Sequence, residues 1–302
     1  MTVGSIQHVS VCICTYKRPA MLRRLLEGLG DQERGGLFTF SIVVVDNDHS
    51  ESARECVEGF SASSSIQVTY CVESRQNIAL ARNRAIENAK GDFVAFIDDD
   101  EFPSNRWLLT LFEACQQYKV DGVLGPVVPH FDEEPPHWVV KGKFYERETY
   151  STGLVIDWKK GRTGNVLLRK HIFSGCEAPF RPEFRTGEDQ EFFYRAIEKG
   201  YVFIWCNEAM AYETIPSIRW NRMFMLRRAL LRGAIQPMTP NFCARDVARS
   251  LIAVSVYMVA LPFALIVGMD KFMNLSVRLC DHLGLLLAVV GINPVKEAYV
   301  TE

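Results

Sequence analysis

The sequence lacks the cysteine spacing of a metal site or a disulfide framework. Nine cysteines are scattered over 302 residues without a CxxC pair or a Cys/His cluster. We therefore expect reduced thiols in the cytosol and no zinc site. The N-terminus also lacks a charged segment followed by a long apolar run, so we expect no signal peptide. A net charge of −2 gives no sign of a nucleic-acid partner.

Negative charge is almost missing from residues 217–249. This segment has one acid, Asp246, and seven arginines: Arg219, Arg222, Arg227, Arg228, Arg232, Arg245 and Arg249. Residues 251–269 follow without a formal charge and are long enough to cross a bilayer core. Because positive flanks normally face the cytosol, we expect membrane association on the cytoplasmic side.

A second apolar segment, residues 272–292, carries Arg278, Asp281 and His282. It is interpreted as a second membrane span, a re-entrant partner or a dimerisation helix. A buried pair of soluble helices is the alternative for both segments. The sequence therefore predicts a C-terminal helical hairpin without deciding whether it crosses a membrane.

Four consecutive acids follow a short apolar run at residues 93–97. The acids are Asp98, Asp99, Asp100 and Glu101. Like charges this close repel one another, and a divalent cation would relieve the repulsion. Oxygen ligands suit Mg²⁺ or Mn²⁺, which also hold phosphate oxygens. The run is interpreted as a metal–diphosphate site, with a solvated acidic turn as the alternative.

The first hundred residues alternate between strand and helix patterns. Strands are expected at 9–14, 40–45, 66–72 and 93–97, and helices at 21–29, 51–60 and 78–89, the last capped by Lys90 and Gly91. This alternation predicts an α/β fold with a mainly parallel sheet and helices on both faces. Polar clusters end three of these strands, at Thr15-Tyr16, at 46–48 and at 98–101, so they should share one ligand-binding edge.

The middle of the chain is less regular. We expect a helix at 107–118, a long loop at 126–138, a short strand entered by Thr163 and Gly164, and a loop at 184–189. A helix should follow at 190–199, with Glu188 and Asp189 at its N-terminus. These two acids could serve the helix dipole alone, as an N-cap, or carry out chemistry.

Together these motifs resemble the inverting family 2 glycosyltransferases of the GT-A fold, most of all the bacterial exopolysaccharide transferases of the succinoglycan type. The resemblance runs from about residue 9 to about residue 233 and includes Gly187-Glu188-Asp189. It implies a Rossmann-like nucleotide-diphospho-sugar transferase domain over 1–240. Residues 241–302 would form the membrane-associated or dimerising hairpin.

The resemblance also implies a set of nucleotide-binding residues. Tyr16 would stack on uracil, Asp46 and Asn47 would read the base, and Asp100 would bind the metal with help from Asp98. The full set for the nucleotide is Thr15, Tyr16, Arg18, Asp46, Asn47, Arg82, Asn83, Asp98, Asp99 and Arg219.

For catalysis the resemblance implies that Asp189 is the general base and that Glu188 assists it. Asn165 would lie near the sugar. Trp158 and Trp220 could form stacking surfaces for the acceptor, or could simply pack inside the protein.

The implied reaction is a metal-dependent transfer, with Mg²⁺ or Mn²⁺, of a sugar from a nucleotide sugar, expected to be UDP-linked, to a saccharide on a polyprenyl diphosphate. A single displacement would form a β-linkage at the cytoplasmic face of the inner membrane, in surface or exopolysaccharide synthesis. The C-terminal helices could also join a homodimer. Two alternatives remain: a sugar nucleotidyltransferase, although residues 15–19 lack its glycine-rich loop, and a non-catalytic membrane scaffold.

Overall fold

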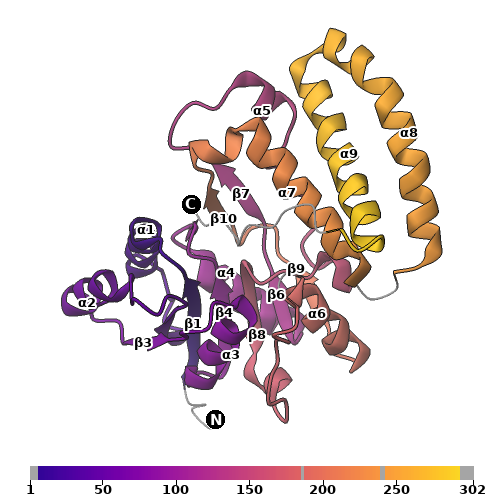
Figure 1. Ribbon diagram of the computed structural model, residues 1–302. Coiled ribbons are helices and arrows are strands. Elements are labelled where there is room, and N and C mark those ends of the chain that lie inside the picture. Colours follow the sequence, from indigo (N-terminus) through magenta and orange to yellow (C-terminus); the bar gives the residue numbers. More distant parts are fainter. Residues whose placement is uncertain (1–5, 185–186, 239–241, 293–302) are drawn as a thin grey trace. The chain divides into compact units, whose positions relative to one another are not determined.

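The computed structural model describes residues 6–184, 187–238 and 242–292 (Figure 1). Contacts divide the chain into two compact units. The first unit comprises Met1–His130 and Arg147–Thr214, and the second comprises Phe131–Glu146 and Ile215–Glu302. The chain therefore leaves the first unit, contributes a short segment to the second, and returns. Arg185 and Thr186, in the loop expected before Glu188, lie outside the described residues.

A seven-stranded sheet forms the centre of the first unit. In spatial order its strands are β3 (Val68–Val72), β2 (Phe38–Asp46), β1 (Gln7–Thr15), β4 (Phe93–Ile97), β8 (Asn165–Arg169), β6 (Gly122–Leu124) and β9 (Phe203–Trp205). Only β8 runs antiparallel to its neighbours. The expected mainly parallel sheet is confirmed.

Helices cover both faces of this sheet, because its central strands are apolar on both sides. One buried cluster joins the sheet to α1 (Pro19–Gly30), α2 (Arg54–Ser63) and α4 (Trp107–Tyr118). The opposite cluster joins it to α3 (Ile78–Asn88) and α6 (Glu188–Glu198). The 3₁₀ helices η1 (Trp158–Lys160) and η2 (Lys170–Phe173) complete the first unit.

A second, three-stranded sheet follows the acidic run. It consists of β5 (Glu101–Pro103), β10 (Ala211–Thr214) and β7 (Val127–His130), in that order. The expectation of a continuous loop over 126–138 is therefore wrong. Strand β7, near the start of this range, pairs with β10. The end of the range forms the beginning of helix α5 (His137–Lys141).

Gly91 does not cap α3 in the expected way. The C-cap is Ala89, in an extended conformation, and Gly91 has no positive φ. A Cβ at Gly91 would lie 2.6 Å from the His8 carbonyl oxygen and 2.8 Å from that of Phe93. Glycine is needed here because two strands pass close to the backbone, which a helix-capping pattern in the sequence cannot distinguish from a cap.

The second unit is helical. It consists of α5, η3 (Ser217–Trp220), α7 (Arg222–Ile235), η4 (Gln236–Met238), α8 (Ala244–Val267) and α9 (Met269–Val289). Helices α8 and α9 form the expected hairpin, and α9 packs on both α7 and α8 (Figure 1).

Helices α7 and α9 approach closely through two glycines. A Cβ at Gly233 would lie 1.9 Å from the Asp281 carbonyl oxygen, and one at Gly284 would lie 2.1 Å from that of Leu230. Because α7 packs this tightly on α9, the division by contacts falls after Thr214. The sequence had suggested a boundary near residue 240.

Candidate functional site

The carboxyl ends of the parallel strands meet at one edge of the main sheet. Thr15, the last residue of β1, lies opposite Asp46 at the end of β2. Strand β4 ends at Ile97, opposite Asn165 at the start of antiparallel β8. The expected convergence of these residues is therefore present, and the acidic run begins at this edge.

The acidic run forms a turn held by Arg18 and Thr15. The Thr15 hydroxyl donates to Asp99 Oδ2 at 2.8 Å. One guanidinium nitrogen of Arg18 lies 3.1 Å from Asp99 Oδ1 and 3.3 Å from Asp100 Oδ2. The backbone N–H of Thr214 donates to the Asp100 carbonyl at 2.7 Å. The turn is thus fixed by side chains from β1 and its following loop and by the backbone of β10.

Burial changes the acidity of Asp99. Its side chain is nearly inaccessible, and this burial raises the pKa of the carboxyl to about 6. Arg18 and the Thr15 hydrogen bond lower this pKa, but the neighbouring Asp100 raises it again. The turn therefore concentrates negative charge that the protein alone only partly neutralises.

Glu101 belongs to the same site, although no role for it could be argued from the sequence. It is 2% exposed and lies opposite Glu213 in the β5–β10 pair. Arg147 donates to Glu213 Oε2 at 2.5 Å. Burial raises the pKa of the Glu101 carboxyl well above its usual value, and nearby Asp98 raises it further. Only the long-range strand pairing, which the sequence does not reveal, places these residues together.

Gly164 makes room for this acidic cluster. A Cβ at this position would lie 2.7 Å from Glu101 Oε1 and 3.0 Å from Asp98 Oδ2. The φ of Gly164 is not positive, so the close approach of the carboxylates, and not backbone strain, requires glycine.

Arg82 connects the acidic turn to helix α6. Its guanidinium pairs with Glu188 and lies 3.5 Å from Asp98 Oδ1. Burial would lower the pKa of Arg82, but the Glu188 and Asp98 carboxylates raise it above its usual value. Burial also raises the pKa of Glu188, and Arg82 only partly offsets this. Glu188 is therefore a buried partner of Arg82.

Asp189 differs from its neighbour in its surroundings. Helix α6 begins at Glu188, after Gly187 with a φ of +81°. Asp189 is half-buried, accepts a hydrogen bond from the N–H of Gln190 at 2.8 Å, and enters no ion pair within the described residues. Of the two acids, Asp189 is the one with a carboxylate available to a substrate.

Two expected base-reading residues are occupied by internal hydrogen bonds. Asp46 accepts from the N–H groups of Asp48 and Ala53 and from the Tyr70 hydroxyl. Asn47 donates to two carbonyls, Glu73 at 2.8 Å and Arg75 at 2.7 Å. Both side chains are buried. In this structure they shape the loop at the end of β2, and their side chains do not reach out toward a base.

Two expected contact residues are likewise internal. Asn83 donates to the Phe180 carbonyl at 2.7 Å and accepts from the Phe180 N–H at 2.9 Å. Asn165 is 2% exposed, accepts from the Trp107 indole at 2.7 Å and donates to two carbonyls. The amide of Asn165 is therefore used within the fold, and the expectation that it lies near the sugar stays a prediction.

The expected aromatic residues have different positions. Tyr16 is half-buried after β1, with Lys17 Nζ 5.2 Å from its ring centre, and remains available to a base. Trp158 packs on Tyr194. Arg219 and Trp220 belong to the second unit, where Trp220 packs on Phe131. The two tryptophans therefore pack against neighbouring rings, and a stacking role toward an acceptor stays a prediction.

No group of three or more His, Cys, Asp or Glu side chains within the described residues encloses a metal ion. This is compatible with Mg²⁺ or Mn²⁺ sites of the kind in which one or two carboxylates bind and phosphate oxygens complete the shell. Asp98, with a side chain 45% exposed, and Asp100 are the carboxylates that fit such an open arrangement. The space left by Gly164 beside Asp98 supports this fit.

Comparison with known proteins assigns the family. Residues 10–184 match the model of glycosyl transferase family 2. The chain belongs to this family. It is 34% identical over 235 residues to the succinoglycan biosynthesis protein ExoM of Rhizobium meliloti, covering 75% of this chain and 73% of that protein. The family 2 member described here is therefore a glycosyltransferase.

Solved structures support the fold. The mannosyltransferase PcManGT from Pyrobaculum calidifontis, solved with GDP-Man and Mn²⁺, has a TM-score of 0.63 at 16% identity and covers 95% of this chain and 87% of its own. Staphylococcus aureus TarS 1–349, solved with UDP, has a TM-score of 0.54 at 16% identity and covers 93% and 90%. The family 2 chain thus has the GT-A fold, as its motifs led us to expect.

Proposed function

We propose that this glycosyltransferase transfers a sugar from a UDP-sugar to a saccharide carried on a polyprenyl diphosphate, at the cytoplasmic face of a membrane. Support for the donor comes from the shared edge of β1, β2 and β4 and from its structural neighbours, which were solved with UDP and with GDP-Man. Support for the acceptor comes from the succinoglycan relative and the apolar helix α8.

The donor diphosphate would bind beside the acidic turn. A divalent cation held by Asp100 and Asp98 would neutralise the diphosphate as it leaves. Arg18, already at the turn, is placed to donate hydrogen bonds to phosphate oxygens. Tyr16 would stack on the base. The protein supplies position and charge here, which is the main requirement for departure of a diphosphate.

The acceptor hydroxyl must lose a proton while it attacks the sugar. Asp189 is the carboxylate we assign to this step, because Glu188 is held by Arg82 whereas Asp189 enters no ion pair with another residue that the structure describes. A single displacement assisted by one base inverts the anomeric carbon and gives a β-linkage from an α-linked donor. The availability of Asp189 at the start of α6 is the observation that carries this proposal.

Replacing the base tests the proposal. Asp189→Asn keeps the shape of the side chain but removes the base, so transfer should fall by at least about 100-fold while UDP affinity changes little. Glu198→Gln, at the exposed end of the same helix, is the matched control and should retain activity. Transfer is measured as UDP release that depends on acceptor, and binding is measured by calorimetry. Retained transfer in Asp189→Asn would refute the assignment.

A further inference from the structure

Helix α8 has an exposed apolar surface that the rest of the second unit does not cover. Of the second-unit helices, it packs mainly on α9. The opposite side of α8 presents residues at helical spacing: Arg245, Arg249, Ile252, Val256, Val259, Phe263 and Ile266. We call this set the α8 stripe. Its five apolar side chains are between 56% and 85% exposed, and an apolar surface this continuous marks an interaction site.

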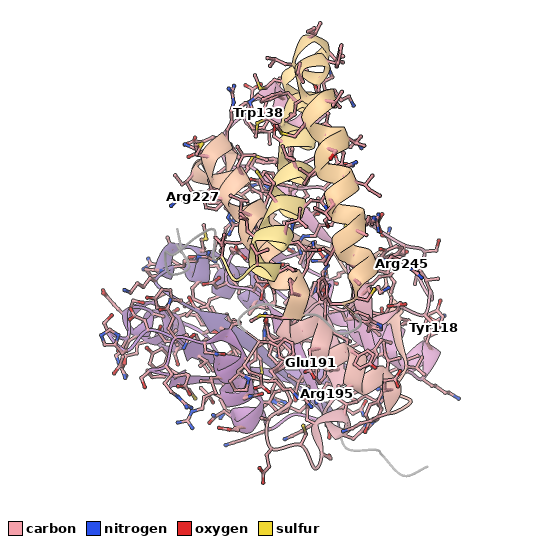
Figure 2. All side chains as sticks on the ribbon, turned by 45° about the vertical axis from the view of Figure 1, so that its right-hand side comes forward. Tyr118, Trp138, Glu191, Arg195, Arg227 and Arg245 are labelled. Atoms are coloured by element: carbon pink, nitrogen blue, oxygen red, sulfur yellow. The ribbon has the colours of Figure 1, made fainter. Side chains whose placement is uncertain are left out.

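The charge on this stripe is confined to one end. Arg245 and Arg249 lie in the first two turns of α8, and Figure 2 shows Arg245 near the start of that helix. A cavity of about 430 Å³ lies along this end, lined by both arginines, by Tyr257 and by small or aliphatic side chains. Asp246, the acid in the first turn, caps the Cys243 N–H at 3.0 Å. Two cations therefore stand beside apolar surface, and the acid close enough to interact with both, Asp246, is already bonded at the start of the helix.

Helix α9 is fixed to the protein at its first turn. Asp270 pairs with Lys141 of α5 at 3.3 Å. One turn later, Asn274 donates to the Gly142 carbonyl at 3.1 Å. The end of the hairpin that would have to enter the bilayer first therefore carries an ion pair and helix α5. Taking these charges through hydrocarbon would be costly.

Helix α9 is also fixed further along. Asp281 pairs with Arg232 of α7 through two bonds, of 2.8 and 2.6 Å, and His282 lies 2.9 Å from the Ser250 hydroxyl of α8. Helix α7, on the other side of α9, carries four arginines, of which Figure 2 labels Arg227. Helix α9 thus has polar partners on α5, α7 and α8, whereas α8 presents the exposed apolar stripe described above.

We propose that α8 lies lengthwise in the interface of an anionic bilayer, so that the hairpin docks on one leaflet without crossing. The α8 stripe then lies among the acyl chains, with Arg245 and Arg249 at the phosphates. Helix α9 lies on the protein side of α8. Interfacial helices bind in this way through apolar area and attraction to anionic lipid. The alternative occupant, a second copy of the same stripe, would add two more arginines and no carboxylate. Charge complementarity therefore favours the bilayer.

Vesicle flotation of the full chain tests this placement. The protein should bind phosphatidylcholine vesicles and bind more tightly when phosphatidylglycerol is included. Arg245→Gln with Arg249→Gln should weaken binding to the anionic vesicles by about 25-fold, since each cation contributes about a factor of five. Val259→Asp with Phe263→Asp should abolish binding to both. Unchanged binding in either double variant would overturn the proposal.

Two controls separate the stripe from general effects. Met223→Asp alters an exposed apolar residue of α7, and Arg84→Gln removes an exposed cation of α3. Both should bind like the unaltered protein. If Phe263→Asp instead converts a lipid-free dimer to a monomer in sedimentation, and vesicles do not bind, a second copy is the occupant and the proposal fails.

Measurements of depth in the bilayer distinguish an α8 helix that lies in the interface from one that crosses the membrane. Tryptophan is introduced singly at Ile252, Val259 and Ile266, and its quenching by lipids brominated at known depths is compared with the unaltered protein. A helix lying in the interface predicts one depth for all three positions. A helix crossing the bilayer predicts different depths among the three positions, because the outer two lie about 20 Å apart along the helix axis, and that result would overturn the proposal. The proposal extends the membrane location assumed in the proposed function, but vesicle binding is measured without donor or acceptor, so either can fail alone.

Discussion

Asp99 makes the acidic turn sensitive to pH before any ligand binds. Its pKa is raised from 3.8 to about 6 by burial. Between these values the folded carboxyl keeps a proton that the unfolded one has lost, so the free energy of unfolding should fall as pH rises through this window. Above pH 6 the contribution of the Asp99 proton to the free energy of unfolding is lost. This contribution amounts to at most about 3 kcal/mol.

Asp99→Asn should remove this pH dependence in metal-free protein. The amide can still accept from Thr15 but has no charge to bury. The variant should therefore gain stability relative to the unaltered protein between about pH 4 and pH 6, measured as urea unfolding in EDTA. Asp31→Asn, which alters an exposed carboxylate, is the control. A difference between Asp99→Asn and the unaltered protein that stays constant with pH would contradict the assigned pKa.

Gly164→Ala should damage the site more than the fold. The new methyl group would press on Glu101 and Asp98, and the carboxylates must move to admit it. We expect a loss of transfer of at least about tenfold, with a melting temperature only a few degrees lower. Gly59→Ala is the matched control, because nothing lies within 4 Å of the added atom. Full activity in Gly164→Ala would show that the acidic cluster tolerates displacement.

At the residue scale, the sequence predicted which side chains would meet but not how they would be used. Consecutive acids after a buried strand were enough to locate the turn. The sequence could not predict that the side-chain amide of Asn165 is fully used in internal hydrogen bonds, because its partners are Trp107 and two carbonyls far along the chain. Glu101 was missed for the same reason, since its pairing with Glu213 arises only between β5 and β10.

At the element scale, Asn165 joins three parts of the first unit. Asn165→Ala would leave the Trp107 indole N–H and the carbonyls of Pro126 and Ala209 without their partner. A buried polar group left unpaired costs about 1–3 kcal/mol, so unfolding should require at least that much less free energy. Asn88→Ala, near the exposed end of α3, should change stability by less than about 0.5 kcal/mol. If Asn165→Ala and Asn88→Ala lowered the free energy of unfolding in urea equally, Asn165 would not be what holds these three parts together.

Long elements were predicted well and short ones were not. The helix expected at 107–118 matches α4, and the strand at 93–97 matches β4. Helical spacing over a dozen residues gives a clear period. Strands such as β6 and β9 have three residues each, too few to show alternation, and their positions depend on partners elsewhere in the sequence.

At the scale of the whole molecule, the sequence predicted an apolar hairpin with a boundary near residue 240, whereas the contacts group α7 with the hairpin. The arginine-rich segment that forms α7 was expected to belong to the transferase domain over 1–240. The close approach of α7 to α9 depends on Gly233 and Gly284, which are far apart in sequence and unremarkable singly. The sequence also did not predict that residues 131–146 belong to the same unit, because such a segment is identified only by its contacts.

The division by contacts predicts how the chain can be shortened. A chain ending at residue 240 keeps α5 and α7 but removes α9, which covers both. It should expose the apolar side of α7 and aggregate. A chain ending at Thr214, with residues 131–146 replaced by a short glycine–serine linker, keeps only the first unit and should remain monomeric with one cooperative unfolding transition. Sedimentation and thermal unfolding check both. A stable monomer from residues 1–240, together with aggregation of the linker version, would show that α7 belongs with the sheet unit.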